Sequence, residues 1–266
     1  MFSTMLLLAQ PAAAQVAPEC VGAVQTFDDE GQQNFLQNYF ALATTLSPTH
    51  GPIPAEGGHG SIGLDVLVIP PLSCEQRMVL GGAKTEDTNK APMAPRPRMI
   101  FAFPEMGNVT IYGGAGYVPP VTLFGTRSVI MSGELGAGMR LGDTHSVGLR
   151  GHATLMKTVA EIATPFVEGS TPYDDFYSGS TFGVDLMYGF ETEKFTPYLA
   201  VGFTDVSTFF VVGDDAYLAQ NTDPYFGLTA SAGVQAHVLE KIDLAAEFYT
   251  APGAIYTGRV RVAYKL

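Results

Sequence analysis

Apolar and polar residues alternate with a period of two along most of the chain beyond Gly60. In the segment 62–68, Ile62, Leu64 and Val66 lie on one face, and Asp65 lies on the other. Successive side chains of a β-strand point to opposite faces of the sheet, so this pattern predicts strands. Ten segments share the pattern, at 60–69, 98–104, 109–118, 126–141, 146–160, 177–190, 195–210, 225–238, 242–250 and 255–266.

The polar faces of these segments hold mostly Gly, Ser and Thr with isolated charges. The solvent face of a soluble β-sandwich is rich in Lys, Glu and Thr, whereas small residues suit the crowded interior of a barrel. Several segments are also longer than ten residues. About 5–6 residues is typical of soluble strands, and about 9–11 residues let a tilted strand cross a bilayer. We therefore expect an all-β fold, a closed antiparallel transmembrane β-barrel.

The connections between these segments alternate in length. The short ones lie at 105–108, 142–145, 191–194 and 239–241, and the long ones at 70–96, 162–176 and 213–224. Outer-membrane barrels have short periplasmic turns and longer external loops. Ten strands then place both chain ends on the short-turn side. Residues 75–84 could supply a further strand, so eight or twelve strands stay open as alternatives.

A helix is expected before the barrel, at 28–46. Asp28 or Asp29 can cap its start, and Ser47-Pro48 ends it because Pro disfavours helix in the preceding residue. The Gly- and Pro-rich stretch 48–60 is a linker. Four apolar residues recur at helical spacing, Phe35, Tyr39, Leu42 and Leu46. Such a helix could plug the lumen, lie on the periplasmic rim or pack on a partner.

The first residues have the features of a secretory signal peptide. A short apolar run at 5–9 is followed by Ala12-Ala13-Ala14, a small-residue cleavage site. The chain then divides into a signal peptide at 1–14, a helical and linker segment at 15–59 and a barrel at 60–266. We expect export to the outer membrane of a Gram-negative bacterium.

Composition narrows the classes of partner. Charged residues make up 15% of the chain, against about 25% in soluble domains, and no run reaches the roughly 18 apolar residues of a membrane helix. A closed barrel is the remaining way to span a bilayer. The net charge of −12 argues against nucleic acid, because phosphate binding needs a basic face.

The end of the chain, 256–266, resembles the last strand of bacterial outer-membrane barrels. Apolar residues alternate there, with Tyr264 two places before Leu266, where the family usually has an aromatic. The resemblance implies recognition by the barrel assembly machinery and contact with outer-membrane lipid and lipopolysaccharide. The order of helix, Gly/Pro-rich lead and barrel is also loosely similar to the long-chain fatty-acid transporter family, in which the N-terminal segment plugs the lumen.

Charged residues of both signs fall on the inward faces. They could form a constriction that selects solutes, or ion pairs that fill a small barrel, and we favour the second interpretation. The set comprises Asp65, Glu134, Arg140, Arg150, His152, Asp185, Asp243, Glu247, Arg259 and Arg261. Because 242–250 should neighbour 255–266, Asp243 and Glu247 are expected close to Arg259 and Arg261.

Two cysteines, Cys20 and Cys74, suggest one disulfide in an oxidising compartment. Cys74 falls on the long-loop side while Cys20 is expected in the periplasm. The bond therefore requires that the N-terminal segment threads the lumen or that the first hairpin differs from the prediction. Two unrelated thiols remain the alternative.

The sequence contains no nucleophile elbow, no metal-binding spacing and no cofactor motif, so we expect no enzyme, metal or cofactor. His152, with Glu134 and Asp185 on adjacent strands, is the best candidate for a rim-located hydrolase. The pairs Asp174-Asp175 and Asp214-Asp215 could reach lipopolysaccharide through divalent cations, although solvated loop charges are the commoner case. The favoured function is passage or binding of a small, hydrophobic solute, and the alternative is a structural or adhesive barrel with a filled lumen.

Overall fold

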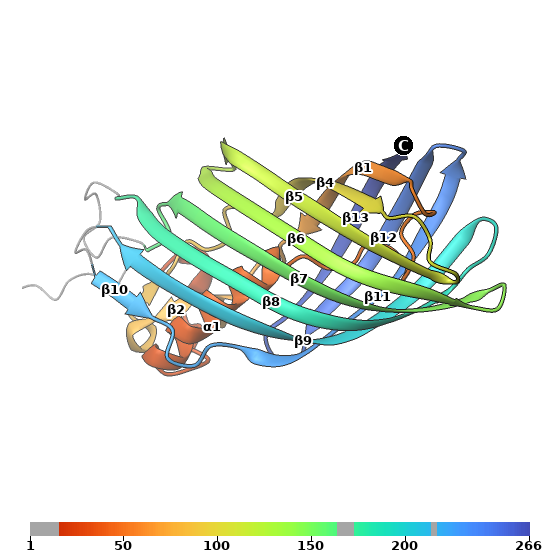
Figure 1. Ribbon diagram of the computed structural model, residues 1–266. Helices are drawn as coiled ribbons and strands as arrows, with labels where there is room; N and C mark the ends of the chain where they lie inside the picture. Colours follow the sequence, from red (N-terminus) through yellow and green to blue (C-terminus); the bar gives the residue numbers. More distant parts are fainter. Residues whose placement is uncertain (1–15, 164–172, 214–216) are drawn as a thin grey trace, which may run out of the picture.

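In the computed structural model, which describes residues 16–163, 173–213 and 217–266, the sheet closes into a barrel of ten antiparallel strands (Figure 1). The first and last strands pair, with Leu64 opposite Val262, so the sheet closes on itself. Its strands are β1 (Gly60–Val68), β4 (Met93–Ala102), β5 (Val109–Leu123), β6 (Thr126–Leu141), β7 (His145–Ala160), β8 (Asp175–Phe190), β9 (Phe195–Val212), β11 (Phe226–Leu239), β12 (Ile242–Ala251) and β13 (Ile255–Lys265). This confirms the predicted class and the count of ten. The expected signal peptide at 1–14 and Asp214-Asp215 lie outside the described residues.

The outward face of the barrel carries an exposed apolar band. Aromatic residues stand near both ends of the strands, with Phe209 and Phe226 toward the long-loop end and Phe195 and Tyr264 toward the short-turn end. Inward positions on the same strands hold small or polar side chains. A closed barrel with an apolar band is suited to a bilayer, because lipid offers no partners for unpaired backbone groups. No helix of the described residues is long and apolar enough to cross a membrane.

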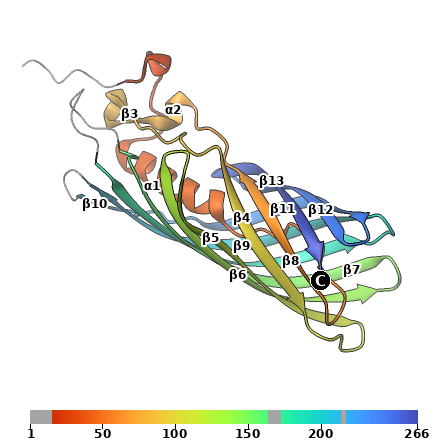
Figure 2. The same ribbon diagram turned by 90° about the horizontal axis from the view of Figure 1, so that it is seen from above.

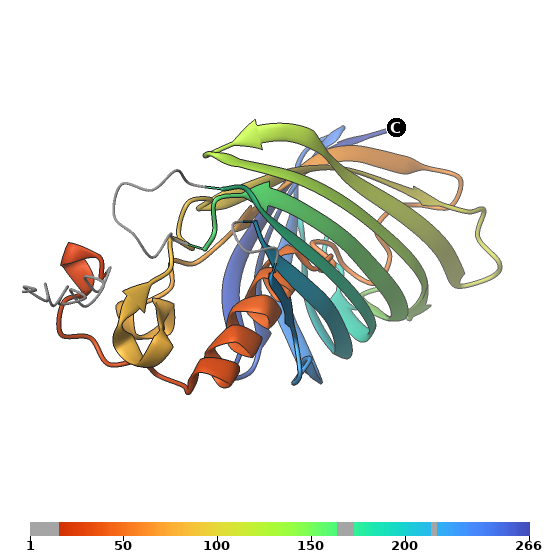
Figure 3. The same ribbon diagram turned by 90° about the vertical axis from the view of Figure 1, so that its left-hand side faces the viewer.

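The helix α1 (Asp29–Thr44) lies inside the barrel at its long-loop end, as the view into that end shows (Figure 3). The Asp28 side chain caps its start by accepting from the Gly31 amide (2.8 Å). Its apolar side, including Tyr39 and Leu42, packs against Val206 of β9 and Tyr249 of β12. The chain continues down the lumen and enters β1 at the opposite end, beside the C-terminus (Figure 2).

The expected position of the N-terminal side is therefore wrong. The amide of Thr26 donates to Glu75 O (3.2 Å), and Asn34 donates to Thr222 Oγ1 (2.9 Å), so both contacts are with long loops. The described residues before α1 thus lie at the long-loop end, and the C-terminus lies at the short-turn end. An even number of strands places the start of β1 at the same end of the barrel as the C-terminus. It gives no information about the path of the segment before β1, which runs through the lumen.

The long β1–β4 connection contains four short elements near the long-loop end. The short helix α2 (Cys74–Arg77) is followed by β2 (Met78–Val79), the turn η2 (Leu80–Gly82) and β3 (Lys84–Thr85), where β2 and β3 pair only with each other. A 3-10 turn η1 (Pro18–Cys20) precedes α1, and β10 (Tyr217–Gln220) pairs antiparallel with the last four residues of β9. Residues 75–84 thus add no barrel strand. The expected alternation of short and long connections holds only in part. Two of the connections at the long-loop end, 124–125 and 252–254, are short turns.

A disulfide joins Cys20 to Cys74. Because α1 and the segment after it thread the lumen, both cysteines lie at the long-loop end, which resolves the conflict in their expected positions. The N-terminal segment is consequently anchored at two points, by the disulfide at one end of the barrel and by β1 at the other.

Candidate functional site

The segment 45–59, which we call the strap, connects α1 to β1 through the lumen. Leu46, Ser47, Thr49 and His50 are each buried. Pro52 sits against three inward glycines on neighbouring strands, Gly138, Gly148 and Gly189, and a Cβ at Gly138 would lie 2.3 Å from Pro52 O. The glycines therefore make room for the strap, which gives the small residues of the inner faces a specific role.

Four buried arginines of the barrel wall hold the end of α1 and the start of the strap. We call Arg96, Arg98, Arg150 and Arg259 the arginine cluster. Each donates to a main-chain carbonyl: Arg96 to Thr44 O (3.0 Å), Arg98 to Ser47 O (3.1 Å), Arg150 to Leu46 O (2.9 Å) and Arg259 to Thr45 O (2.7 Å). The last carbonyls of a helix lack intrahelical partners and carry partial negative charge, so guanidinium groups there satisfy and stabilise the helix end.

Glu134 of β6 lies at the centre of the charged network. It accepts from Arg98 Nε (3.0 Å) and Arg150 Nε (2.6 Å), and His50 Nε2 lies 3.4 Å away. Arg98 also reaches Asp65 (3.0 Å), and Arg150 reaches Asp185 (2.7 Å). These ion pairs tie five strands to one another and to the strap.

The predicted adjacency of the β12 carboxylates and the β13 arginines is confirmed, but Glu247 and Arg259 find other partners. Glu247 stands opposite Arg259 in the ladder, but it accepts from Thr49 N (2.9 Å) and Tyr198 OH (3.0 Å). Arg259 instead stacks over the Tyr249 ring at 4.2 Å. The strap supplies partners that cannot be inferred from strand adjacency.

Two of the predicted lumen charges lie at the short-turn end, away from this network. Arg140 is half-exposed and pairs with Glu105 (3.1 Å). Asp243 pairs with His237 (2.8 Å) and Lys265 (3.0 Å). Both line a polar basin of about 670 Å³ at this mouth of the barrel. Arg261 lies between the two groups, where it donates to Ser61 Oγ (3.0 Å).

The sequence analysis missed three residues of the network, Arg96, Arg98 and His50. Arg96 and Arg98 alternate with prolines in Pro95-Arg96-Pro97-Arg98, and the expected strand began only at 98 because Pro is rare within sheets. The spacing of two residues between Arg96 and Arg98 could have indicated that both side chains lie on the inward face of a strand. His50 carried no signal, since it stands in the linker.

The barrel wall splits between β4 and β5 toward the long-loop end. The two strands pair only from Arg98–Gly116 to Ala102–Tyr112. Above that level β4 pairs with β1 alone and β5 with β6 alone. Prolines occupy both sides of the split, Pro95 and Pro97 on β4 and Pro119 and Pro120 on β5. Because proline has no backbone N–H to donate, these residues account for the missing ladder.

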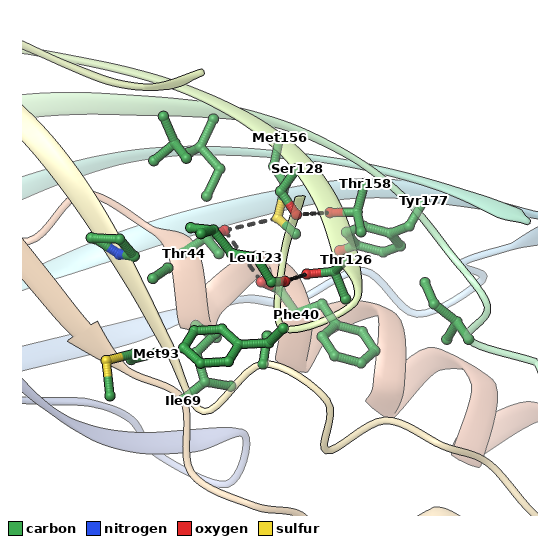
Figure 4. A pocket seen from close by; sticks show the side chains of 18 of the residues that line it. Phe40, Thr44, Ile69, Met93, Leu123, Thr126, Ser128, Met156, Thr158 and Tyr177 are labelled. Atoms are coloured by element: carbon green, nitrogen blue, oxygen red, sulfur yellow. Dashed lines mark hydrogen bonds between the residues drawn. The ribbon is translucent and has the colours of Figure 1, made fainter. Parts of the chain in front are cut away.

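A chamber lined by apolar side chains lies behind the split, and we call it the wall chamber (Figure 4). Phe40 of α1, Met93 of β4 and Met156 of β7 contribute to its lining, and its volume is about 90 Å³. Val121 and Leu123 also line it, yet they are 47% and 37% exposed, so the chamber is open on this side.

A second chamber lies at the long-loop mouth, between α1, the β2–β3 hairpin and β9–β10. This mouth chamber has a volume of about 300 Å³ and is lined by Leu36, Val79, Phe210 and Val212 among others. Its few charged residues include Asp29, and the side-chain amide of Gln25, which donates to that carboxylate (3.0 Å), lowers the pKa of Asp29.

The remaining candidates form no separate site. His152 is buried in the lumen beside Asp185 (3.5 Å) rather than at the rim. Asp175 accepts from the amides of Ile162, Ala163 and Gly213 and so holds two loops together. Among the described residues, no three His, Cys, Asp or Glu side chains are grouped as a metal site requires.

No protein family matches the sequence, and no curated protein is similar to it at the sequence level. The translocator domain of the autotransporter NalP from Neisseria meningitidis aligns with a TM-score of 0.42 at 11% identity, over 79% of this chain and 89% of that one. The toluene transporter TodX of Pseudomonas putida aligns with a TM-score of 0.39 at 11% identity, over 94% and 78%. Ail, the attachment invasion locus protein of Yersinia pestis, aligns with a TM-score of 0.36 at 10% identity, over 79% and 99%.

Scores and identities this low carry no argument about function, and these three alignments do not show the similarity to the long-chain fatty-acid transporter family. The class follows from the molecule itself: its strand ladder closes through β1 and β13, and its outward face is apolar. The chain is an outer-membrane β-barrel whose lumen holds its own N-terminal segment.

Proposed function

We propose that this protein takes up a small, neutral, apolar solute at its long-loop mouth and releases it sideways through the split between β4 and β5. The observation that carries the proposal is the position of the wall chamber, directly behind the part of the wall where the β4–β5 ladder is missing. An apolar solute in that chamber has a route to the bilayer that avoids the charged lumen.

The surface around the split supports this route. Outward residues beside it are apolar and exposed, including Val68, Met93 and Tyr117. Exposed charges toward the long loops lie at the tip of the β5–β6 hairpin or on strands farther round the barrel: Arg127 of β6, Lys157 of β7 and Asp205 of β9. An apolar molecule leaving the wall chamber would therefore meet lipid-like surface rather than charge, which keeps the transfer favourable.

Restoring the missing backbone donors tests the route. The double variant Pro95→Thr/Pro97→Thr should let β4 and β5 extend their pairing and narrow the split. We expect uptake of the dye 1-N-phenylnaphthylamine by intact Gram-negative cells to fall at least threefold relative to the wild-type protein. Pro197→Thr is the matched control, because Pro197 lies on β9 where pairing with β11 is continuous. Equal uptake by the double variant and the control would contradict the sideways route.

The alternative is a structural or adhesive barrel that transports nothing. The filling of the lumen by the strap and its ion pairs favours it, since such a network stabilises a closed barrel. It predicts that cells carrying the wild-type protein take up the dye no faster than cells without it.

A further inference from the structure

Phe40 stands between the two apolar chambers. Four residues line both chambers, and they form the partition that separates them: Phe40, Thr88, Ile162 and Tyr177. Phe40 projects from α1 toward this partition, where its ring meets Tyr177 edge-on with centroids 5.7 Å apart (Figure 4). A solute moving from the mouth chamber to the wall chamber must pass this pair.

The two rings differ in how they are held. Tyr177 is buried and donates from its hydroxyl to Gln37 O (2.7 Å), so its ring is fixed to the helix. Phe40 has no polar atom in its side chain and is only partly buried. Rotation of a phenylalanine between staggered rotamers breaks no hydrogen bond. Phe40 is therefore the movable member of the pair.

The chamber volumes indicate why a movable ring is needed. An apolar cavity of about 150 Å³ accommodates benzene. The mouth chamber, at about 300 Å³, exceeds that size, whereas the wall chamber, at about 90 Å³, falls below it. A single-ring molecule can thus occupy the first chamber and can enter the second only if a lining side chain moves.

The lining of the wall chamber determines whether a charged molecule can follow this path. Of the described residues that line the wall chamber, none is Asp, Glu, Lys, Arg or His. Burying an unpaired charge in such surroundings is costly. A neutral molecule can cross the partition, while an anion or cation would remain at the mouth.

We propose that Phe40 is a gate that sets the largest neutral apolar molecule able to pass from the mouth chamber to the wall chamber. This inference rests on the proposed function, because it assigns the size limit of the same path. The C-terminal half of α1 thereby has two tasks: its end is held by the arginine cluster, and Phe40, one turn earlier, controls the partition.

Uptake of two fluorescent hydrocarbon-like dyes by intact Gram-negative cells tests the gate. 1-N-Phenylnaphthylamine has the smaller rigid unit, a naphthalene whose attached phenyl ring can rotate about the linking nitrogen, whereas the four fused rings of pyrene form one wider rigid unit. We expect Phe40→Ala to raise the initial rate of pyrene uptake at least threefold, and Phe40→Trp to lower that of 1-N-phenylnaphthylamine at least threefold. Phe35→Ala removes the same ring from the same helix but lines neither chamber, so it should leave both rates unchanged. Rates are compared at equal amounts of folded barrel, measured by heat-modifiable migration on gels.

Two results would overturn the gate, and they are distinguishable. If the wild-type protein accelerates dye uptake but neither Phe40 variant alters it, Phe40 sets no size limit and the proposed function survives. If cells carrying the wild-type protein and cells without it take up both dyes equally, the proposed function fails and the gate fails with it.

Discussion

Glu134 of β6 accepts a hydrogen bond from Arg150 of β7 at 2.6 Å, in the middle of the lumen. The same Arg150 donates to Leu46 O of the strap (2.9 Å). One buried carboxylate thus orients a guanidinium that holds the N-terminal segment in place. The contact links the stability of the barrel wall to the closure of the lumen.

Replacing Glu134 with Gln should weaken both properties. The variant leaves Arg98 and Arg150 without their shared counter-ion, and breaking a buried ion pair costs about 3–5 kcal/mol. We expect the free energy of unfolding to fall by about 3 kcal/mol, measured by urea titration of the barrel in lipid vesicles. Glu193→Gln, in the exposed turn between β8 and β9, is the control and should change little. A loss below 1 kcal/mol would mean that Glu134 does not hold the network together.

Much of the wall could be predicted from the sequence because one physical rule governs it. Each strand must alternate between lipid and lumen, so the ten segments were visible and their ends agree with the structure to within a few residues. The exceptions are β4 and β5: the expected strands began at 98 and ended at 118, whereas β4 begins at Met93 and β5 continues to Leu123. Both missed segments contain prolines, Pro95 and Pro97 in β4 and Pro119 and Pro120 in β5. The same prolines interrupt the pairing of β4 with β5.

The site was less predictable, because the strap forms most of it. Arg98, Arg150 and Glu134 meet through strand pairing, but their contacts with Leu46 and Ser47 join residues about fifty to a hundred positions apart. No periodicity describes an irregular segment, and a carbonyl acceptor has no sequence signature. The contact of His50 with Glu134 and the packing of Pro52 against the inward glycines could not be predicted for the same reason.

The packing of Pro52 against the inward glycines of the barrel wall leads to a second prediction. A Cβ at Gly138 would lie 2.3 Å from Pro52 O, which is far inside contact distance, so Gly138→Ala must displace the strap. We expect the free energy of unfolding to fall by about 1–3 kcal/mol, the usual cost of overpacking. Gly151→Ala is the control, since the nearest atom to its Cβ, Leu135 O, is 3.9 Å away. Equal urea midpoints for the two variants would mean that the strap does not pack against Gly138.

The disulfide provides a test of which way the chain threads the barrel. Cys20 and Cys74 both lie at the long-loop end, so a membrane-impermeant reductant followed by an impermeant maleimide should label both on intact cells. A cysteine placed at the other end by Glu193→Cys, in the Cys20→Ser/Cys74→Ser background, should react only after the outer membrane is permeabilised. Labelling of Cys20 that also required permeabilisation would put the N-terminal segment in the periplasm, in conflict with the threaded arrangement.

The final prediction concerns the N-terminal segment as a plug. Deleting 28–46 removes α1 and the carbonyls of Thr44, Thr45 and Leu46, to which three arginines of the cluster donate. The freed guanidinium groups would then be hydrated, because charged side chains retain water unless they are paired, and water in the lumen permits ion flow. The deletion is made in the Cys20→Ser/Cys74→Ser background, which relieves the tether to the β1–β4 loop, and that background alone is the control. We expect discrete single-channel steps in planar bilayers for the deletion and none for the control. A deletion variant that folds with intact heat-modifiable migration yet conducts no ions would show that the wall charges and the rest of the strap close the barrel without α1.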